Sequence, residues 1–183
     1  MNAFILDADP STAAHFHCDK HVVKMIVESM QMLGSAVIRH GATPDQMPLT
    51  AKGTPLRGGY HHHPCTRWTG DSRANYDWIV KLAVALCDEY TYRYNKVHAS
   101  TEAILHLAAM TRMIPDGPLT PFAVAISPEQ RCRQAVPDFD KLDVVDQYRL
   151  YYIHDKADFA KWTARRVPFW FTSHQHKTNN TTK

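Results

Sequence analysis

The 183-residue chain lacks the features that mark several large classes of protein. Its four cysteines are far apart and none forms a CxxC pair, which excludes a zinc ribbon or a disulfide scaffold, so we expect free thiols. Glycine and proline number only 7 and 11, which excludes a fibrous repeat. No apolar run approaches the roughly 18 residues of a membrane span and no basic leader is present, so we expect a cytoplasmic protein.

The net charge is also small, and the positive excess is unevenly distributed. Lysine and arginine total 21 against 18 acidic residues, which gives +3 with histidine neutral. From Lys156 onward six basic residues face the single acid Asp158, leaving +5 there and −2 before it. A net charge this small does not by itself indicate a nucleic-acid-binding protein, but the carboxyl-terminal segment is distinctly basic.

The hydrophobic pattern indicates helices. Asp9 and Pro10 supply an N-cap and a first helical position, and apolar residues then recur at three- and four-residue steps to about Gly41. This predicts one long first helix. A loop rich in Gly, Pro and Thr follows over 42–64, and its length is typical of a functional segment.

The rest of the chain predicts further helices and no sustained strand. The expected helices cover about 71–95, 101–113 and 142–165, with a short one opened by a capping box at 127–130. Glu89 and Arg93 have the spacing of an intrahelical ion pair, for which we expect a structural role. The fold class is therefore mainly α: a compact single-domain bundle of about four to five helices over 1–171, with a polar, flexible tail over 172–183.

Four polar side chains share one face of the expected first helix. They lie at i, i+4, i+7 and i+11 and are His17, His21, Lys24 and Glu28. Imidazoles titrate near neutrality, a carboxylate can hold a neighbouring imidazole, and nearby cations or burial can make a lysine amine nucleophilic. The stripe predicts a catalytic acid/base site, although a solvated helix face with an ion pair explains the same spacing equally well.

Histidines four residues apart on a helix can also bind zinc or iron. His63 could complete such a site with His17 and His21. The segment that starts at His17 lacks the glutamate that directly follows the first histidine in zinc-protease helices. We therefore expect no metal and no other cofactor, with zinc or iron on these three histidines as the alternative.

Two further places carry residues suited to phosphate. Arg73 and Asn75 stand where a helix is expected to begin, and helix N-termini attract anions, although aromatic packing and an Arg73–Asp77 pair offer a structural explanation. The last expected helix interleaves aromatic residues with arginines, as proteins that hold unpaired bases do. The candidate substrate- or phosphate-binding residues are His63, Arg73, Asn75, Arg149, Trp162, Arg165 and Arg166.

Several segments resemble one family of DNA repair enzymes. They span nearly the whole chain and read CDKHVVKM, HHPCTRW, SRANYDW, CDEYTYRYNKVH, LTPF and FAKWTARRVPFWF. On these segments the chain resembles a phage-associated family labelled pyrimidine-dimer DNA glycosylase, which is similar to the phage enzyme endonuclease V. The resemblance implies a small all-helical DNA glycosylase and AP lyase that flips a base and attacks the sugar with its N-terminal amine.

The chain departs from that enzyme at two places. The enzyme loses its initiator methionine before a small residue, whereas Asn2 follows Met1 here. Its catalytic glutamate lies in an Arg-Glu-Leu sequence of the first helix, and the corresponding stretch here, residues 20–24, is followed by no acid before Glu28 and contains none itself. We expect His21, Lys24 and Glu28 to replace the missing groups.

These observations favour a DNA glycosylase or lyase that acts on a damaged or modified pyrimidine, with DNA or a nucleotide as its partner. If the protein is phage-encoded, it would act in the host cytoplasm. A nucleotide- or small-molecule-processing metalloenzyme built on the histidine cluster is the first alternative. A non-catalytic phage protein that binds nucleic acid or a host factor is the second.

Overall fold

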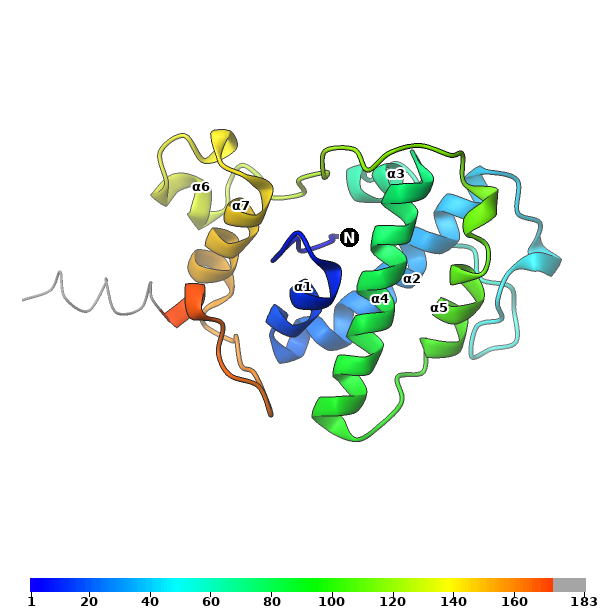
Figure 1. The fold of residues 1–183 in the computed structure, drawn as a ribbon, viewed down its shortest axis with the longest axis horizontal. Coiled ribbons are helices and arrows are strands. Elements are labelled where there is room, and N and C mark those ends of the chain that lie inside the picture. Colours follow the sequence, from blue (N-terminus) through cyan, green and yellow to red (C-terminus); the bar gives the residue numbers. More distant parts are fainter. Residues whose placement is uncertain (173–183) are drawn as a thin grey trace, which may run out of the picture.

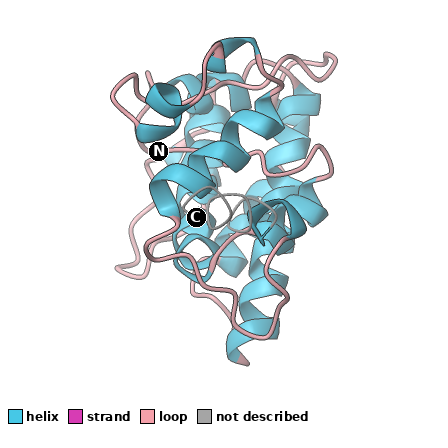
Figure 2. Ribbon diagram, turned by 90° about the vertical axis from the view of Figure 1, so that its left-hand side faces the viewer, coloured by secondary structure: helices cyan, strands magenta, loops and turns pink. Residues whose placement is uncertain are grey.

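The computed structural model describes residues 1–172 and consists of helices joined by loops (Figures 1 and 2). The labelled α-helices are α1 (Pro10–Phe16), α2 (Asp19–Arg39), α3 (Pro64–Thr69), α4 (Arg73–Tyr94), α5 (Thr101–Ala108), α6 (Arg131–Ala135) and α7 (Val144–Tyr151), and residues 169–172 are helical as well. Within the described residues no strand forms, so the mainly α prediction is confirmed. No helix of this part of the chain is long and apolar enough to cross a membrane. The expected tail over 172–183 lies, apart from its first residue, outside the described residues.

The two longest helices, α2 and α4, form the centre of the molecule. They pack against each other, and α1 packs against α4 (Figure 1). Their inner faces carry the periodic apolar residues that predicted them. Among the fully buried side chains are Met25, Ile26, Leu33, Ile79, Leu82 and Leu86.

The first six residues run through the interior between α2 and α7. Phe4 stacks on His21 of α2, with ring centroids 4.4 Å apart, and meets Tyr148 and Tyr152 edge-on. Ile5 and Leu6 are fully buried. The start of the chain is therefore part of the core, and Figure 1 shows it between α7 and α4.

The expected first helix is interrupted at His17 and Cys18. Both residues have extended backbone, so α1 ends before them and α2 begins after them. The break is stabilised from far away in the sequence. The backbone N–H of Asp19 donates to the carbonyl of Lys161 at 2.8 Å, and its carboxylate accepts hydrogen bonds from Thr163. The three- and four-residue spacing of apolar residues continues across the break, so the sequence pattern did not reveal that the helix is interrupted.

The prediction for α4 is confirmed at both ends. The Ser72 side chain accepts a hydrogen bond from the backbone N–H of Asn75, and Asn95 ends the helix in the left-handed region at φ 52°. The expected loop over 42–64 is present with one 3-10 turn at Pro44–Gln46. The short helix α3, directly after it, was not predicted.

Three other predictions need correction. The expected helix over 101–113 ends as α5 at Ala108, and a separate 3-10 turn, Thr111–Met113, follows it. The expected helix over 142–165 ends as α7 and a single π-helical turn, Tyr152–Lys156, because the following segment is drawn onto α1 and α4 by side-chain contacts. The capping box at 127–130 does not form. Instead, the carboxylate of Asp155 accepts the first N–H groups of α6, from Arg131 and Cys132.

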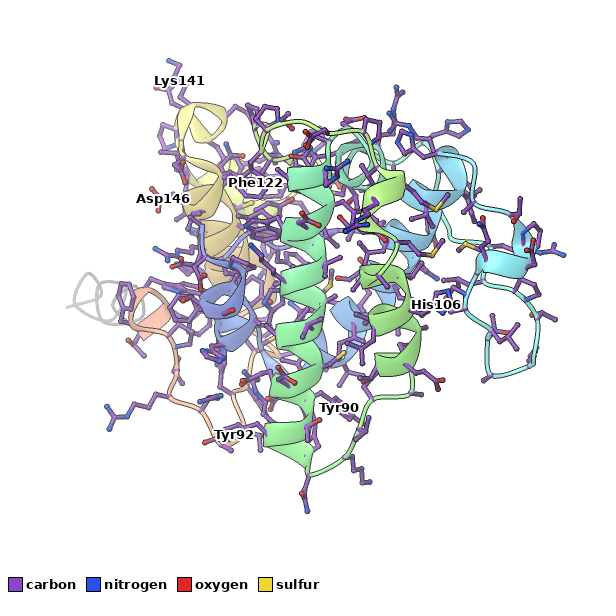
Figure 3. All side chains as sticks on the ribbon, turned by 45° about the vertical axis from the view of Figure 1, so that its right-hand side comes forward. Tyr90, Tyr92, His106, Phe122, Lys141 and Asp146 are labelled. Atoms are coloured by element: carbon purple, nitrogen blue, oxygen red, sulfur yellow. The ribbon has the colours of Figure 1, made fainter. Side chains whose placement is uncertain are left out.

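A buried carboxylate on α4 ties the carboxyl-terminal segment to the bundle. Glu89 is 1% exposed and accepts hydrogen bonds from Arg93 at 2.7 Å and Arg165 at 2.8 Å. Burial alone would raise the pKa of Glu89, but the two arginines hold it below its ordinary value. Arg165 also lies 3.9 Å from the ring centre of Tyr92, at the end of α4 (Figure 3). The expected Glu89–Arg93 pair is confirmed.

Replacing Glu89 by glutamine should be strongly destabilising, because it leaves two arginines around an uncharged group in a buried site. We expect Glu89→Gln to lower the free energy of unfolding by about 3 kcal/mol, measured by urea denaturation at pH 7. Asp116→Asn is the control, since it breaks an exposed pair with Arg73 and should cost less than about 1 kcal/mol. Equal losses from the two variants would contradict a structural role for the buried network.

Candidate active site

Glu28, in the middle of α2, lies in a cleft of about 340 Å³. Three segments form the cleft: the start of the chain, one face of α2 and the end of the loop before α3. The lining residues are Met1, Val23, Lys24, Val27, Glu28, Gln31 and Tyr60. This volume lies within the range of pockets that hold small organic groups.

The carboxylate of Glu28 has a nitrogen partner on each side. Its Oε2 accepts the backbone N–H of Asn2 at 2.6 Å and lies 3.8 Å from the α-nitrogen of Met1. Its Oε1 lies 3.2 Å from Nζ of Lys24, one helical turn away. One nearly buried anion is thus flanked by an α-amine and a lysine ammonium, a set suited to amine chemistry with an adjacent carboxylate.

The side chain of Asn2 fixes the start of the chain beside Glu28. Its Oδ1 accepts a hydrogen bond from the hydroxyl of Tyr148 at 2.8 Å, and its Nδ2 donates to the carbonyl of Ala125 at 2.9 Å. The Met1 side chain is buried although the residue as a whole is half-buried. The exposed atoms of Met1 are therefore those of the chain end, which faces the cleft.

Tyr60 places an exposed aromatic ring at the rim of the cleft. Its φ of 52° lies in the left-handed region, which costs a non-glycine residue about 1 kcal/mol or more. The turn is fastened to α2 by Ser35, whose hydroxyl accepts the N–H of Gly59 at 2.7 Å and donates to its carbonyl. A strained residue held beside a cleft is typical of a functional position.

His17 and His21 do not join Lys24 and Glu28 in this cleft. His17 lies outside α2, is fully buried, and places Nδ1 2.6 Å from the carbonyl of Ala13. His21 is buried against Phe4, with Nδ1 2.5 Å from the Tyr152 hydroxyl. The prediction that the four side chains converge is therefore wrong. The helix break turns His17 into the core, His21 packs against Phe4, and only Lys24 and Glu28 line the cleft.

His63 lies close to this cleft without lining it. Its Nδ1 accepts the backbone N–H of Cys65 and so caps α3. Burial, followed by the nearby α-amino group of Met1, lowers the pKa of His63. Burial also raises the pKa of Cys65 to about 11, which leaves its thiol protonated at neutral pH. Neither side chain is placed as a nucleophile.

None of the other expected phosphate ligands lines the Glu28 cleft, and most have internal partners. The segment 114–120 covers the N-terminus of α4, so the expected anion contact is not available there: Asn75 is fully buried against Thr120. The remaining contacts are Arg73 with Asp116, Arg149 with Asp7 and Leu6, Trp162 with Phe16, and Arg165 with Glu89, while Arg166 is exposed.

The alternative metal site is not assembled. Among residues 1–172 no group of three or more His, Cys, Asp or Glu side chains is arranged to hold a metal ion. His17 and His21 lie in the core beside Tyr152, whereas His63 caps α3 at the other side of the cleft. The three histidines therefore do not form a common site.

Met1 and Tyr60 are among the lining residues that the sequence alone did not identify. The α-amine of Met1 was implied only by the family resemblance, and Tyr60 carried no signal apart from its place in a long loop. The pair Gly58 and Gly59 before Tyr60 was the only sequence feature that could have indicated a tight turn here, because glycine allows the close approach of residue 58 to Ser35.

The chain belongs to the pyrimidine dimer DNA glycosylase family, whose sequence profile matches residues 1–102. The matched region contains every residue that lines the Glu28 cleft. It excludes α6, α7 and the basic carboxyl-terminal segment. No curated protein and no solved structure matches the chain significantly.

The two core histidines predict how stability depends on pH. Burial lowers the pKa of His17 to about 4, and burial together with nearby cationic groups lowers that of His21 to about 3, against 6.5 in an unfolded chain. The unfolded state therefore binds more protons below pH 6.5. Stability due to these groups should be fully present above that pH and fall by up to about 1.4 kcal/mol per pH unit for each histidine as the pH drops toward 4.

Urea denaturation between pH 7.5 and 4 measures this dependence. We expect the variant His17→Gln/His21→Gln to be less stable at pH 7 but to lose less stability on acidification than the wild type. The exposed His61→Gln/His62→Gln variant is the control and should follow the wild-type curve. A wild-type slope retained without the core histidines would assign the acid sensitivity to other groups.

Proposed function

We propose that the protein is a DNA glycosylase with AP lyase activity that acts on a damaged or modified pyrimidine, with the α-amine of Met1 as nucleophile. Membership of the pyrimidine dimer DNA glycosylase family supports the DNA substrate. The observation that carries the mechanism is the placement of Glu28. Its carboxylate lies 3.8 Å from that amine and accepts the next N–H of the chain at 2.6 Å.

The reaction follows from these groups. The neutral amine attacks C1′ of the target nucleotide, the C1′–N bond to the base breaks, and the base leaves with that electron pair and takes up a proton. The sugar ring then opens to an imine between C1′ and the α-nitrogen, and its ring oxygen becomes a hydroxyl. Loss of a proton from C2′ expels the 3′ phosphate, which cuts the strand. Glu28 stabilises the cationic sugar and carries protons between nitrogen and oxygen.

The α-amine suits this role better than the side chain of Lys24. The α-amine is held beside the Glu28 carboxylate by the hydrogen bond from the next N–H of the chain, that of Asn2, to the same oxygen. Lys24 is also more exposed, at 66% of its side chain. Its ammonium group is placed to balance the charge of Glu28 and to attract the DNA backbone.

The remaining walls of the cleft suit an extruded base. Val23 and Val27 expose apolar surface on α2, and the ring of Tyr60 stands across from them at the rim. Enzymes that act on a base remove it from the stack and hold it between aromatic and apolar side chains. Tyr60 is therefore the stacking residue of this proposal.

The central test is strand cleavage by Glu28→Gln. With duplexes that contain either ultraviolet-induced pyrimidine dimers or an abasic site, we expect the wild type to cut both and Glu28→Gln to be slower by at least about 100-fold. Glutamine preserves the size and the hydrogen bond from Asn2 but removes the charge.

Lys24→Gln is the matched control, because it removes the other partner of Glu28 and leaves the carboxylate with the α-amine. We expect a loss of less than about tenfold. A wild type that cuts neither duplex would reject the proposed function. A larger loss from Lys24→Gln than from Glu28→Gln would reject the assignment of roles.

Tyr60 provides a prediction in which stability and activity change in opposite directions. Tyr60→Gly should raise the free energy of unfolding by about 1 kcal/mol, because glycine adopts positive φ without strain. It should slow cleavage of dimer-containing DNA by about tenfold, since base–aromatic stacking contributes about 1–3 kcal/mol. Tyr60→Phe should match the wild type in both measurements. Unchanged cleavage by Tyr60→Gly would exclude the stacking role.

A further inference from the structure

A second cleft, of about 370 Å³, lies between α2, α3 and the loop that carries Tyr60. Its lining residues are Ser35, Arg39, His61, His62, Thr66 and Arg67. We propose that this distal cleft binds backbone phosphates of the DNA about five nucleotides from the nucleotide in the active site. The inference rests on the proposed function, and it adds a strand-positioning site.

The chemistry of the distal cleft is that of an anion site. Four of its six lining residues are arginine or histidine, and none of the six is acidic. Arg39 pairs with Asp71 at 2.8 Å, but the side chains are 42% and 46% exposed, so the pair contributes little to stability and can be exchanged for a phosphate. Arginine presents several N–H groups in a plane that matches phosphate oxygens.

The wall of the distal cleft contains a polar group without a partner. Thr66 is 3% exposed, and its hydroxyl Oγ1 is buried with no hydrogen-bond partner in the structure. Buried hydroxyls are nearly always hydrogen-bonded in proteins, so an isolated one on the wall of a cationic cleft indicates a missing acceptor. A phosphate oxygen supplies such an acceptor.

The geometry of α2 relates the two clefts. Glu28 and Arg39 are eleven residues apart, about three turns, so they project from nearly the same side of the helix at a separation of about 16 Å along its axis. Phosphates of one DNA strand recur at about 3.4 Å along the duplex axis, so this distance spans about five nucleotides.

The loop between the clefts keeps this spacing constant. Tyr60 lines the active-site cleft, and His61, the next residue, lines the distal cleft. Ser35 fastens the preceding Gly59 to α2 through two hydrogen bonds. A strand that passes from one cleft to the other therefore crosses this anchored loop, which covers α2 at Ser35.

Binding to duplexes of different length tests the distal cleft. The probes carry a non-cleavable abasic analogue with either twelve base pairs on both sides or twelve on one side and two on the other, and affinity is measured by fluorescence anisotropy at several salt concentrations. For Arg39→Gln/Arg67→Gln we expect about tenfold weaker binding to the long duplex and a salt dependence shallower by about two ion equivalents. On the duplex shortened on the side that reaches this cleft, the variant should bind like the wild type.

Lys96→Gln/Lys141→Gln is the control for loss of two charges. Both lysines are exposed, and Lys141 projects from the far corner of the molecule (Figure 3). This control should bind both duplexes like the wild type. Asp71→Asn, which releases Arg39 from its ion pair, should bind the long duplex at least as tightly as the wild type. Thermal unfolding of each variant verifies that it is folded.

The outcomes separate the two proposals. If Arg39→Gln/Arg67→Gln binds the long duplex like the lysine control, or loses equal affinity for all duplexes, the distal cleft is not a strand-positioning site. Those results would leave the Glu28 chemistry untouched if the wild type still cuts abasic DNA. A wild type that binds with the expected length dependence but never cuts would retain the distal cleft and reject the proposed function.

Discussion

The hydrogen bond from the backbone N–H of Asn2 to the carboxylate of Glu28 is the constraint on which the site depends. A carboxylate that is nearly removed from water is costly unless donors and cations surround it. Here the chain end supplies both a donor and a cation, and Lys24 supplies a second cation. The same contact therefore gives the Glu28 carboxylate a hydrogen-bond donor and places an amine beside it.

That contact requires the first residues to be part of the core. Phe4 packs between α2 and α7, and Asn2 is held by Tyr148 of α7. Helix α7 lies outside the region matched by the family profile, yet it fixes the position of the proposed nucleophile. The carboxyl-terminal half therefore contributes support to a cleft whose lining residues all come from the first 60 positions of the chain.

Helix α2 organises the remaining features. Along one of its sides it carries Glu28 at the active-site cleft, Ser35 at the loop anchor and Arg39 at the distal cleft. The strained backbone of Tyr60 is maintained by that anchor, which keeps the aromatic ring exposed where a base would enter. A single rigid helix thereby relates the proposed chemistry, base stacking and phosphate contact in space.

Local signals in the sequence predicted the parts of the fold that local interactions determine. The helix expected over about 71–95 matches α4, whose ends are set by the local groups Ser72 and Asn95, and the Glu89–Arg93 spacing gave the observed ion pair. The break at His17 was not predictable, because Lys161 and Thr163 stabilise it from the other end of the chain. For the same reason, the expected stripe brings only Lys24 and Glu28 together. The break removes His17 from α2, and His21, although it lies on α2, is buried against Phe4 and Tyr152, which are distant in the sequence.

Arg73, Asn75, Arg149 and Arg165 illustrate a second limit. Their residue types suit phosphate, but nothing local to them shows that a carbonyl, a hydroxyl or a carboxylate distant in the sequence already occupies each one. Conversely, Arg39 and Arg67 attracted no attention in the sequence, because the fold alone brings them together with His61 and His62.

The most direct test of the account is the position of the covalent bond formed when the protein reacts with abasic-site DNA and the product is reduced with borohydride. Tandem mass spectrometry of the digested adduct locates the modified nitrogen. The account predicts attachment to the α-nitrogen of Met1 and little adduct with Glu28→Gln. Attachment to Nζ of Lys24, or an undiminished yield without the Glu28 charge, would contradict it.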